Sequence, residues 1–320
     1  MNKYLFLGLS KIQGIGEKTL NLFFNAYNTI GDKILSYSKE KLKSIGVPSK
    51  CVTRLFFALR DIDNLIRIGK HYEDQLNKRN VYFFLKEELP EPLKKYNWLF
   101  FSGNLDQIFD LIQNFGKNYK VAFVGTRHPD PCTPYKKIIK NYVLFLKSKF
   151  KDNLYVVSGM ADGIDKEAHL ISFEENVPTV AILGFGLDYA EKLMSKEFKK
   201  ALKEGNFIAV SQFLPDKKPS KESFLCRNNL IVDFSEEIVF VQGKIPSGTY
   251  STLTKAIKTR KPVVIPNYKG NEEFYEFIVR IKYPFTKIID NNSNQISCYS
   301  LTNSQPQQAD LFKFRKVNVV

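Results

Sequence analysis

Short apolar runs that alternate with amphipathic segments are the sequence feature that most constrains the fold. The runs have the length of buried strands, are rich in β-branched residues, and lie at 121–124, 155–157, 180–183, 207–210, 238–241 and 263–265. Helix-like segments lie between them, for example at 135–150, 163–175 and 251–259. This alternation predicts an α/β fold with an extended Rossmann-type, mostly parallel sheet and helices on both of its faces.

The segments around this alternation divide the chain into three predicted domains. Residues 1–75 have a helical pattern, residues 76–270 carry the Rossmann-type sheet, and residues 271–320 form a C-terminal extension. The extension is expected to hold one more helix at 272–280 and a flexible, Asn/Ser/Gln-rich tail from residue 291.

The N-terminal segment contains two candidate helix-hairpin-helix motifs, at 9–20 and 42–50. Gly14 and Gly16 can adopt backbone angles that other residues resist, and amides exposed at a helix start can hold a phosphate. The motif resembles that of non-specific DNA binders, so this small helical domain either contacts DNA or is a generic pair of helical turns.

The charge balance favours a polyanionic partner. The chain has 48 Lys and Arg against 33 Asp and Glu, a formal net charge of +15. Such a surplus is typical of proteins that bind nucleic acid or an anionic membrane surface. An AT-rich genome, which raises the content of Lys, Asn, Phe and Tyr, is the competing explanation.

Several classes of protein are disfavoured by what the sequence does not contain. The four cysteines lie far apart and the three histidines do not cluster near them, so we expect no zinc site and no disulfide framework. The N-terminal apolar run is too short for a signal peptide, and no run reaches the 18 to 20 apolar residues of a spanning helix. We therefore expect a soluble, cytoplasmic protein with no membrane partner.

Small residues follow several of the predicted strands, at the edge where ligands bind open parallel sheets. Glycines allow close approach to a ligand, hydroxyls and amides at helix starts suit phosphates, and an Arg offers a planar fork. One such loop is ordinary turn chemistry, but several on one edge predict a phosphate-binding groove. The predicted DNA- or phosphate-binding residues are Gly125, Thr126, Arg127, Ser158, Gly159, Gly163, Phe185, Phe224, Arg227, Asn228, Lys244, Ser247, Gly248 and Thr249.

The aromatic residues near these loops either stack on bases or belong to the core, and the titratable residues are either catalytic or structural. Phe185, between two glycines, is the best candidate for stacking on a base. His169 is expected to pack or cap within its helix, and Asp162, Asp165 and Asp188 to cap helices or contact ribose. Neither GxGxxG nor GxxxxGK[ST] is present. We therefore predict no cofactor, no catalytic residue and no ATP hydrolysis.

The ordered set GTR, SGMADGIDKEAH, AILGFGLD, FLCRNN and VFVQGKIPSGTYST, across roughly 121–266, resembles the DNA-processing protein A (DprA/Smf) family. The resemblance implies an extended Rossmann domain that binds single-stranded DNA without sequence preference. It also implies a homodimer, and delivery of the strand to a RecA-type recombinase during DNA uptake (natural transformation, competence) or recombination.

The chain departs from that family's pattern around the groove. Gln212 and Gln242 stand where the family has acidic residues, Leu225 replaces the Pro of its FPxRN segment, and Asn229 replaces a second Arg. The Tyr-Pro after the GLD segment and a winged-helix domain are not found. These changes affect the base pocket and the dimer interface more than the phosphate contacts, and losing two carboxylates reduces repulsion of a polyanion.

The C-terminal tail contains QADLF at 308–312, which resembles the pentapeptide that docks bacterial repair proteins on the sliding clamp. A Gln offers hydrogen bonds and a Leu-Phe pair fills an apolar pocket, while the preceding segment supplies reach. The competing interpretation is that the tail packs on the body of the protein. The predicted clamp-docking residues are Gln308, Asp310, Leu311 and Phe312.

Two alternative functions remain open from the sequence. One is a nucleotide-binding or nucleotide-processing Rossmann enzyme or sensor, although the loop at 242–249 lacks the PGGxGTxxE pattern of the related phosphoribohydrolases. The other is a sliding-clamp-tethered adaptor in which the groove no longer binds a ligand. Salt-sensitive binding of oligo-dT separates the leading hypothesis from both.

Overall fold

The computed structural model describes residues 1–320 except 194, 269, 292–294, 301–314 and 318–320. The predicted clamp-docking residues 308–312 therefore lie outside the described residues. The α-helices are α1 (Lys3–Ser10), α2 (Glu17–Ile30), α3 (Lys39–Ser44), α4 (Ser49–Ala58), α5 (Ile62–Asn77), α6 (Leu105–Gln113), α7 (Tyr135–Phe150), α8 (Ile164–Glu174), α9 (Leu187–Leu193), α10 (Lys196–Glu204), α11 (Lys221–Phe234), α12 (Gly248–Lys258) and α13 (Glu272–Arg280). Short 3-10 turns are η1 (Gly31–Ser36), η2 (Lys86–Glu88), η3 (Leu93–Lys95) and η4 (Lys151–Asn153).

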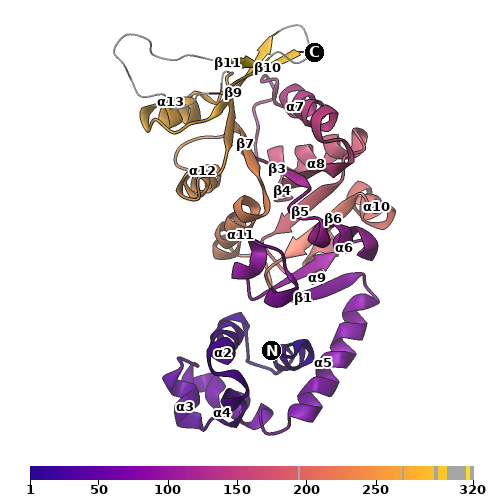
Figure 1. Cartoon of the computed structure of the whole chain (residues 1–320), viewed down its shortest axis with the longest axis vertical. Coiled ribbons are helices and arrows are strands. Elements are labelled where there is room, and N and C mark those ends of the chain that lie inside the picture. Colours follow the sequence, from indigo (N-terminus) through magenta and orange to yellow (C-terminus); the bar gives the residue numbers. More distant parts are fainter. Residues whose placement is uncertain (194, 269, 292–294, 301–314, 318–320) are drawn as a thin grey trace.

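The strands form one sheet in the order β1-β2-β6-β5-β4-β3-β7-β8-β9-β10-β11 (Figure 1). They are β1 (Val81–Leu85), β2 (Trp98–Ser102), β3 (Tyr119–Gly125), β4 (Leu154–Ser158), β5 (Thr179–Leu183), β6 (Phe207–Ser211), β7 (Glu237–Gln242), β8 (Val263–Pro266), β9 (Thr286–Asn291), β10 (Gln295–Ser300) and β11 (Arg315–Val317). The neighbouring strands β6, β5, β4, β3, β7, β8 and β9 pair in parallel. At the two edges, β1 and β2 on one side and β10 and β11 on the other pair antiparallel with their neighbours.

The apolar runs of the sequence are the adjacent parallel strands β3, β4, β5, β6, β7 and β8, so the predicted α/β fold is confirmed. The chain builds the sheet outward from β3 through β4 and β5 to β6. It then returns to the other side of β3 to add β7 and β8. The order therefore reverses between β3 and β7, and such a reversal opens a crevice at the carboxyl ends of the two strands.

Helices cover both faces of the sheet because successive strand residues point to opposite faces. One face packs against α6, α11, α12 and α13 through residues such as Leu111, Leu230 and Leu253. The other face packs against α7 and α8 through residues such as Val143 and Ala168. The helix that follows β3 (α7) and the helix that follows β7 (α12) thus lie on opposite faces.

The N-terminal segment folds as two helical hairpins, α1–α2 and α3–α4, as the sequence predicts. Gly14 and Gly46 lie in the two turns with φ of +84° and +88°, the left-handed region that favours glycine. Phe6 of α1 is fully buried, and its ring lies 4.5 Å from that of Trp98 and 5.1 Å from that of Phe83. The helical segment and the sheet therefore share one hydrophobic cluster.

The described part of the C-terminal segment contains one helix and three strands. The predicted helix at 272–280 is α13, and its Phe274 and Ile278 are buried against the sheet. Within the tail that the sequence predicts to be flexible from residue 291, Gln295–Ser300 form β10, which pairs with β9. Domain limits at 75 and 270 stay a prediction. Within the described part of the chain, no helix is both long and apolar enough to cross a membrane.

Candidate functional site: a groove at the sheet's switch point

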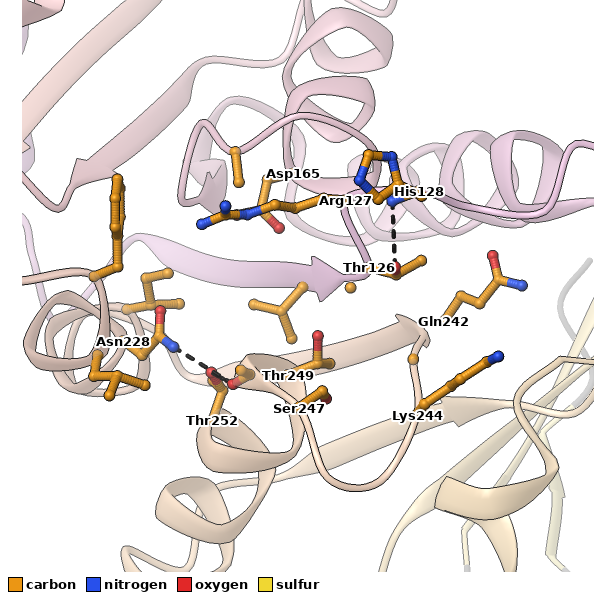
Figure 2. A pocket seen from close by; sticks show the side chains of 18 of the residues that line it. Thr126, Arg127, His128, Asp165, Asn228, Gln242, Lys244, Ser247, Thr249 and Thr252 are labelled. Carbon is orange, nitrogen blue, oxygen red and sulfur yellow. Dashed lines mark hydrogen bonds between the residues drawn. The ribbon is translucent and has the colours of Figure 1, made fainter. Parts of the chain in front are cut away.

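A groove of about 920 Å³ lies at the carboxyl ends of β3 and β7, where the strand order reverses (Figure 2). Its walls come from the loop after β3, the first half of α11, and the loop after β7 together with the start of α12. Segments that are far apart in the sequence therefore meet at one site, as the spacing of the small-residue loops predicts.

The loop after β3 supplies Gly125, Thr126 and Arg127. A Cβ at Gly125 would lie 2.5 Å from Ile164 and 2.9 Å from the Gln242 carbonyl oxygen, so the close contact between β3 and its neighbours requires glycine. The Thr126 amide donates to the Gln242 carbonyl at 2.8 Å, which ties the two loops together. The Arg127 guanidinium lies 5.4 Å from the Phe224 ring and lines the groove.

The loop after β7 leads directly into α12. The Ser247 hydroxyl accepts a hydrogen bond from the Tyr250 amide at 3.0 Å and so caps this helix. Gly248 is exposed, with open space where a Cβ would be, while Thr249 beside it is almost buried. Lys244 is exposed at the rim. The free amides at the start of a helix, together with the helix dipole, bind anions well when that helix start opens into a groove.

Helix α11 forms the third wall. Asn228 donates to the Gly248 carbonyl at 3.5 Å, which joins α11 to α12 (Figure 2). Phe224 is half-buried, and Leu225 is 52% exposed at the groove. Lys221 is exposed one turn before Phe224 and Leu225.

Arg227, predicted from the sequence to bind DNA or phosphate, lines the groove but is almost wholly buried. It is 4% exposed, donates to the Ile182 carbonyl at 3.1 Å, and lies 3.7 Å from the Asp165 carboxylate. Burial lowers the pKa of Arg227 and raises that of Asp165, because desolvation outweighs their mutual attraction. The pair closes one wall of the groove but has little surface to offer a ligand.

Three predicted positions around the loop after β4 make contacts inside the protein, although Ala161 of this loop lines the groove. The Ser158 hydroxyl is fully buried and donates to the Phe123 carbonyl at 2.6 Å. A Cβ at Gly159 would lie 1.2 Å from the Arg227 guanidinium, and Gly163 has φ of +80° at the start of α8. These three positions hold the loops together, and none of them lines the groove.

Phe185, the residue that the sequence favours for stacking on a base, does not line the groove. Its ring is 8% exposed and packs edge-on against Phe224, with centroids 6.2 Å apart. Both rings line a smaller adjoining cavity of about 250 Å³, separated from the groove by Arg127 and Phe224. Phe185 as placed offers its ring to Phe224 rather than to a base in the groove.

Sequence reasoning missed Lys221 and Leu225 of α11 as lining residues, although it included Phe224 and Asn228. Lys221, Leu225 and Asn228 follow one another at intervals of four and three residues, which places them on one side of a helix. That spacing, beside the already recognised Phe224, was the signal that could have found Lys221 and Leu225. Gln242, which stands where the family has an acidic residue, also lines the groove. It is buried, and its Oε1 accepts a hydrogen bond from the Asp130 amide at 3.2 Å.

The electrostatics of the groove favour an anion. Arg127, Lys221 and Lys244 line it and form no ion pair with any residue that the structure describes. Of the lining carboxyls, Asp165 is paired with Arg227, and Asp130 accepts from the Cys132 amide. No cluster of three or more potential metal ligands occurs among the described residues.

Comparisons with known proteins agree with this geometry. The family model for DNA recombination-mediator protein A matches residues 81–276. The DNA processing protein DprA of Streptococcus pneumoniae is 24% identical over 261 residues, which cover 72% of this chain and 86% of that protein. DprA of Bacillus subtilis is 30% identical over 147 residues, which cover 46% of this chain and 48% of that protein.

A solved structure supports the same fold. The X-ray structure of DprA from Streptococcus pneumoniae superimposes with a TM-score of 0.61 at 20% identity, and the match covers 89% of this chain and 94% of that one. The family model spans the whole groove, from β3 to α13. On this evidence, the chain belongs to the DNA recombination-mediator protein A family.

Proposed function

We propose that the groove binds single-stranded DNA through its phosphates, without sequence preference. One observation carries this proposal: Arg127, Lys221, Lys244 and the exposed start of α12 converge on one groove of about 920 Å³. Phosphate contacts carry no sequence information, so binding of this kind is sequence-independent. The net charge of +15 and membership in a family of recombination mediators support the same ligand.

The stacking surface in the groove is Phe224 with Leu225. Phe224 is half-buried beneath the Arg127 guanidinium, and Leu225 stands exposed beside it. A planar ring and an aliphatic side chain give every base a similar apolar contact. Gly159 and Gly163 act indirectly in this proposal, since they hold the loops that position Arg127 and Thr126.

Fluorescence anisotropy with labelled oligo-dT at low and moderate salt tests the proposal. Arg127→Ala should weaken binding at least about tenfold, because a charge-assisted contact to phosphate is lost. Lys117→Ala is the matched control, since it removes one exposed positive charge from the turn before β3, at the opposite end of that strand. Absence of binding by the unaltered protein at low salt would refute the proposal.

We further propose that the bound strand is handed to a RecA-type recombinase in the cytoplasm, by a homodimer of this chain. Its support is the family of recombination mediators to which the chain belongs. The protein should shorten the lag before the recombinase assembles on DNA coated with single-strand-binding protein, and Arg127→Ala should not. Sedimentation at micromolar concentration tests the dimer, and a monomer would count against it.

The clamp-docking segment 308–312 is proposed from sequence alone. QADLF combines a hydrogen-bonding Gln with an apolar Leu-Phe pair that fits a hydrophobic pocket. The sliding clamp should be recovered with the unaltered protein and lost with a Leu311→Ala, Phe312→Ala double variant. Equal recovery would refute the segment's role.

The enzyme alternative makes a separate prediction. A nucleotide-processing Rossmann enzyme would release a base from nucleoside monophosphates, and the oligo-dT assay would show no dependence on Arg127. The groove's carboxyls already have partners, as Asp165 is paired with Arg227 and Asp130 accepts from a backbone amide. We therefore propose that the protein acts as a binding protein without turnover.

A further inference from the structure

Helix α4 ends in two adjacent phenylalanines, one of which is strongly exposed. Phe57 is 61% exposed, which is the highest exposed fraction among the large hydrophobic side chains whose burial the structure describes. Phe56 beside it is half-buried against the helical core, and the two rings lie 5.5 Å apart at 75°. Phe56 thus anchors the pair, while Phe57 presents its ring to solvent.

Cations surround this aromatic pair. Lys39 Nζ lies 5.4 Å from the Phe56 ring and 5.2 Å from the Phe57 ring, and the Arg60 guanidinium lies 4.5 Å from the Phe56 ring. Neither cation has an ion-pair partner within the part of the chain that the structure describes. We name Lys39, Phe56, Phe57 and Arg60 the aromatic–cation surface.

The same hairpin carries a large positive excess. Between residues 33 and 60 the only acidic residue is Glu40, and the basic residues are Lys33, Lys39, Lys41, Lys43, Lys50, Arg54 and Arg60. The pKa of Glu40 is lowered by its own backbone amide and the Ser38 hydroxyl, and to a smaller extent by the charges of Lys43 and Lys39. A surface of this charge complements a polyanion.

This surface is distinct from the groove and from the hairpin turn. None of its residues lines the groove. The turn with Gly46 joins the end of α3 to the start of α4, whereas Lys39 begins α3 and Phe57 lies at the end of α4. In Figure 1, α3 and α4 lie at the end of the molecule opposite β9 and β10.

We propose that the aromatic–cation surface is a second contact for single-stranded DNA, in which a base stacks on Phe57 and Lys39 and Arg60 hold the flanking phosphates. An exposed aromatic ring between unpaired cations is the combination that binds single strands without sequence preference. The inference rests on the proposed function, since it assigns the same strand a further point of attachment beyond the groove.

A tryptophan placed by Phe57→Trp gives a signal local to this surface. The native Trp98 is 3% exposed and supplies a constant background. Oligo-dT should quench the new fluorescence saturably, and rising salt should weaken the quench. Phe109→Trp is the matched control, because Phe109 is 42% exposed on α6 and has no cation over its ring among the described contacts.

Affinity gives a second readout. Phe57→Ala should weaken binding of a long oligo-dT about fivefold, the lower end of what losing one stacking platform costs. In an Arg127→Ala background, the quench of Phe57→Trp should persist, since the two contacts are separate.

The outcomes separate this inference from the proposed function. Arg127-dependent oligo-dT binding with no quench at Phe57→Trp would overturn the second contact and leave the groove intact. Quenching by an acidic peptide as strong as that by oligo-dT would also overturn it, because the surface would then recognise an acidic protein. Quenching at Phe57→Trp, together with an oligo-dT affinity that Arg127→Ala leaves unchanged, would instead support this surface and refute the groove.

Discussion

The loops after β4 and β7 both combine serine and glycine ahead of a helix, yet they occupy different surroundings. After β4, the Ser158 hydroxyl bonds within the core and Gly159 lies against Arg227. After β7, Ser247 caps α12 and Gly248 faces open space beside the groove. Ser158 and Gly159 of the first loop are occupied by contacts within the protein, whereas Ser247 and Gly248 of the second loop line the groove.

The position of each strand in the sheet explains this difference. Strand β4 lies between β3 and β5 on the side where the chain builds outward in order. Strands β3 and β7 flank the reversal, and the helices that follow them, α7 and α12, pack on opposite faces. That divergence leaves room at the ends of β3 and β7, whereas the end of β4 is filled by Arg227 and Asp165.

The largest expected effect on stability is at Arg227. Arg227→Ala should lower the free energy of unfolding by about 3–5 kcal/mol, because Asp165 would be left buried without its partner. Urea unfolding followed by circular dichroism measures this loss. In contrast, Arg127→Ala removes a groove-lining side chain without an ion pair among the described residues and should change stability by less than about 0.5 kcal/mol.

Replacing Arg227 and Asp165 together by Met and Asn provides the control for this prediction. The double variant should recover part of the stability, because no unpaired charge remains buried. A stable Arg227→Ala variant that has lost oligo-dT binding would make Arg227 a direct ligand and remove the contrast between the two walls.

Because of His169 in α8, the free energy of unfolding should be about 2 kcal/mol lower at pH 5 than at pH 7. Burial lowers the pKa of His169 to about 3, with a further contribution from Arg227, and its Nδ1 bonds the Thr179 hydroxyl at 2.7 Å. Because the unfolded chain takes up the proton near its usual pKa of about 6.5, stability should fall as pH falls below that value.

Thermal melts across this pH range compare the unaltered protein with His169→Gln. The variant should be less stable at pH 7, since it loses packing against Phe198 and Phe207, but its pH profile should be flatter. Parallel profiles for the two proteins would show that another group causes the pH dependence.

Two glycine substitutions compare the loops directly. Gly159→Ala should cost about 1–3 kcal/mol, because the new methyl group overlaps the Arg227 guanidinium. Gly248→Ala meets nothing and should leave stability within about 1 kcal/mol, while weakening oligo-dT binding a few-fold by covering amides at the start of α12. Equal losses of stability would mean that the two loops are packed alike.

The sequence predicts the parallel sheet well because strand length, β-branched content and alternation are local properties. It also predicts that the loops after β3 and β7 meet, since carboxyl ends of parallel strands share one edge. It does not predict the strand order, and hence cannot tell which loops flank the reversal. For that reason the sequence places Gly125 and Gly248 in one group with Ser158 and Gly159.

The remaining differences between the predicted and the observed groove residues arise from burial, which depends on contacts between distant parts of the chain. Arg227 and Phe185 have the residue types of ligands, but their environment depends on Asp165 and Phe224, which are distant in sequence. Conversely, Lys221 and Leu225 belong to α11, whose hydrophobic pattern gives no sign of which side faces a groove. The aromatic–cation surface is a tertiary feature too, because Lys39 and Phe57 come from different helices.

The salt dependence of oligo-dT binding tests the central claim about the open wall most directly. Each phosphate contact to a single strand contributes about 0.7 to the slope of log affinity against log salt concentration. Replacing Arg127, Lys221 and Lys244 together by Ala should therefore reduce that slope by about 2 and leave the fold unchanged. An unchanged slope and affinity in a folded triple variant would contradict the assignment of this groove to single-stranded DNA.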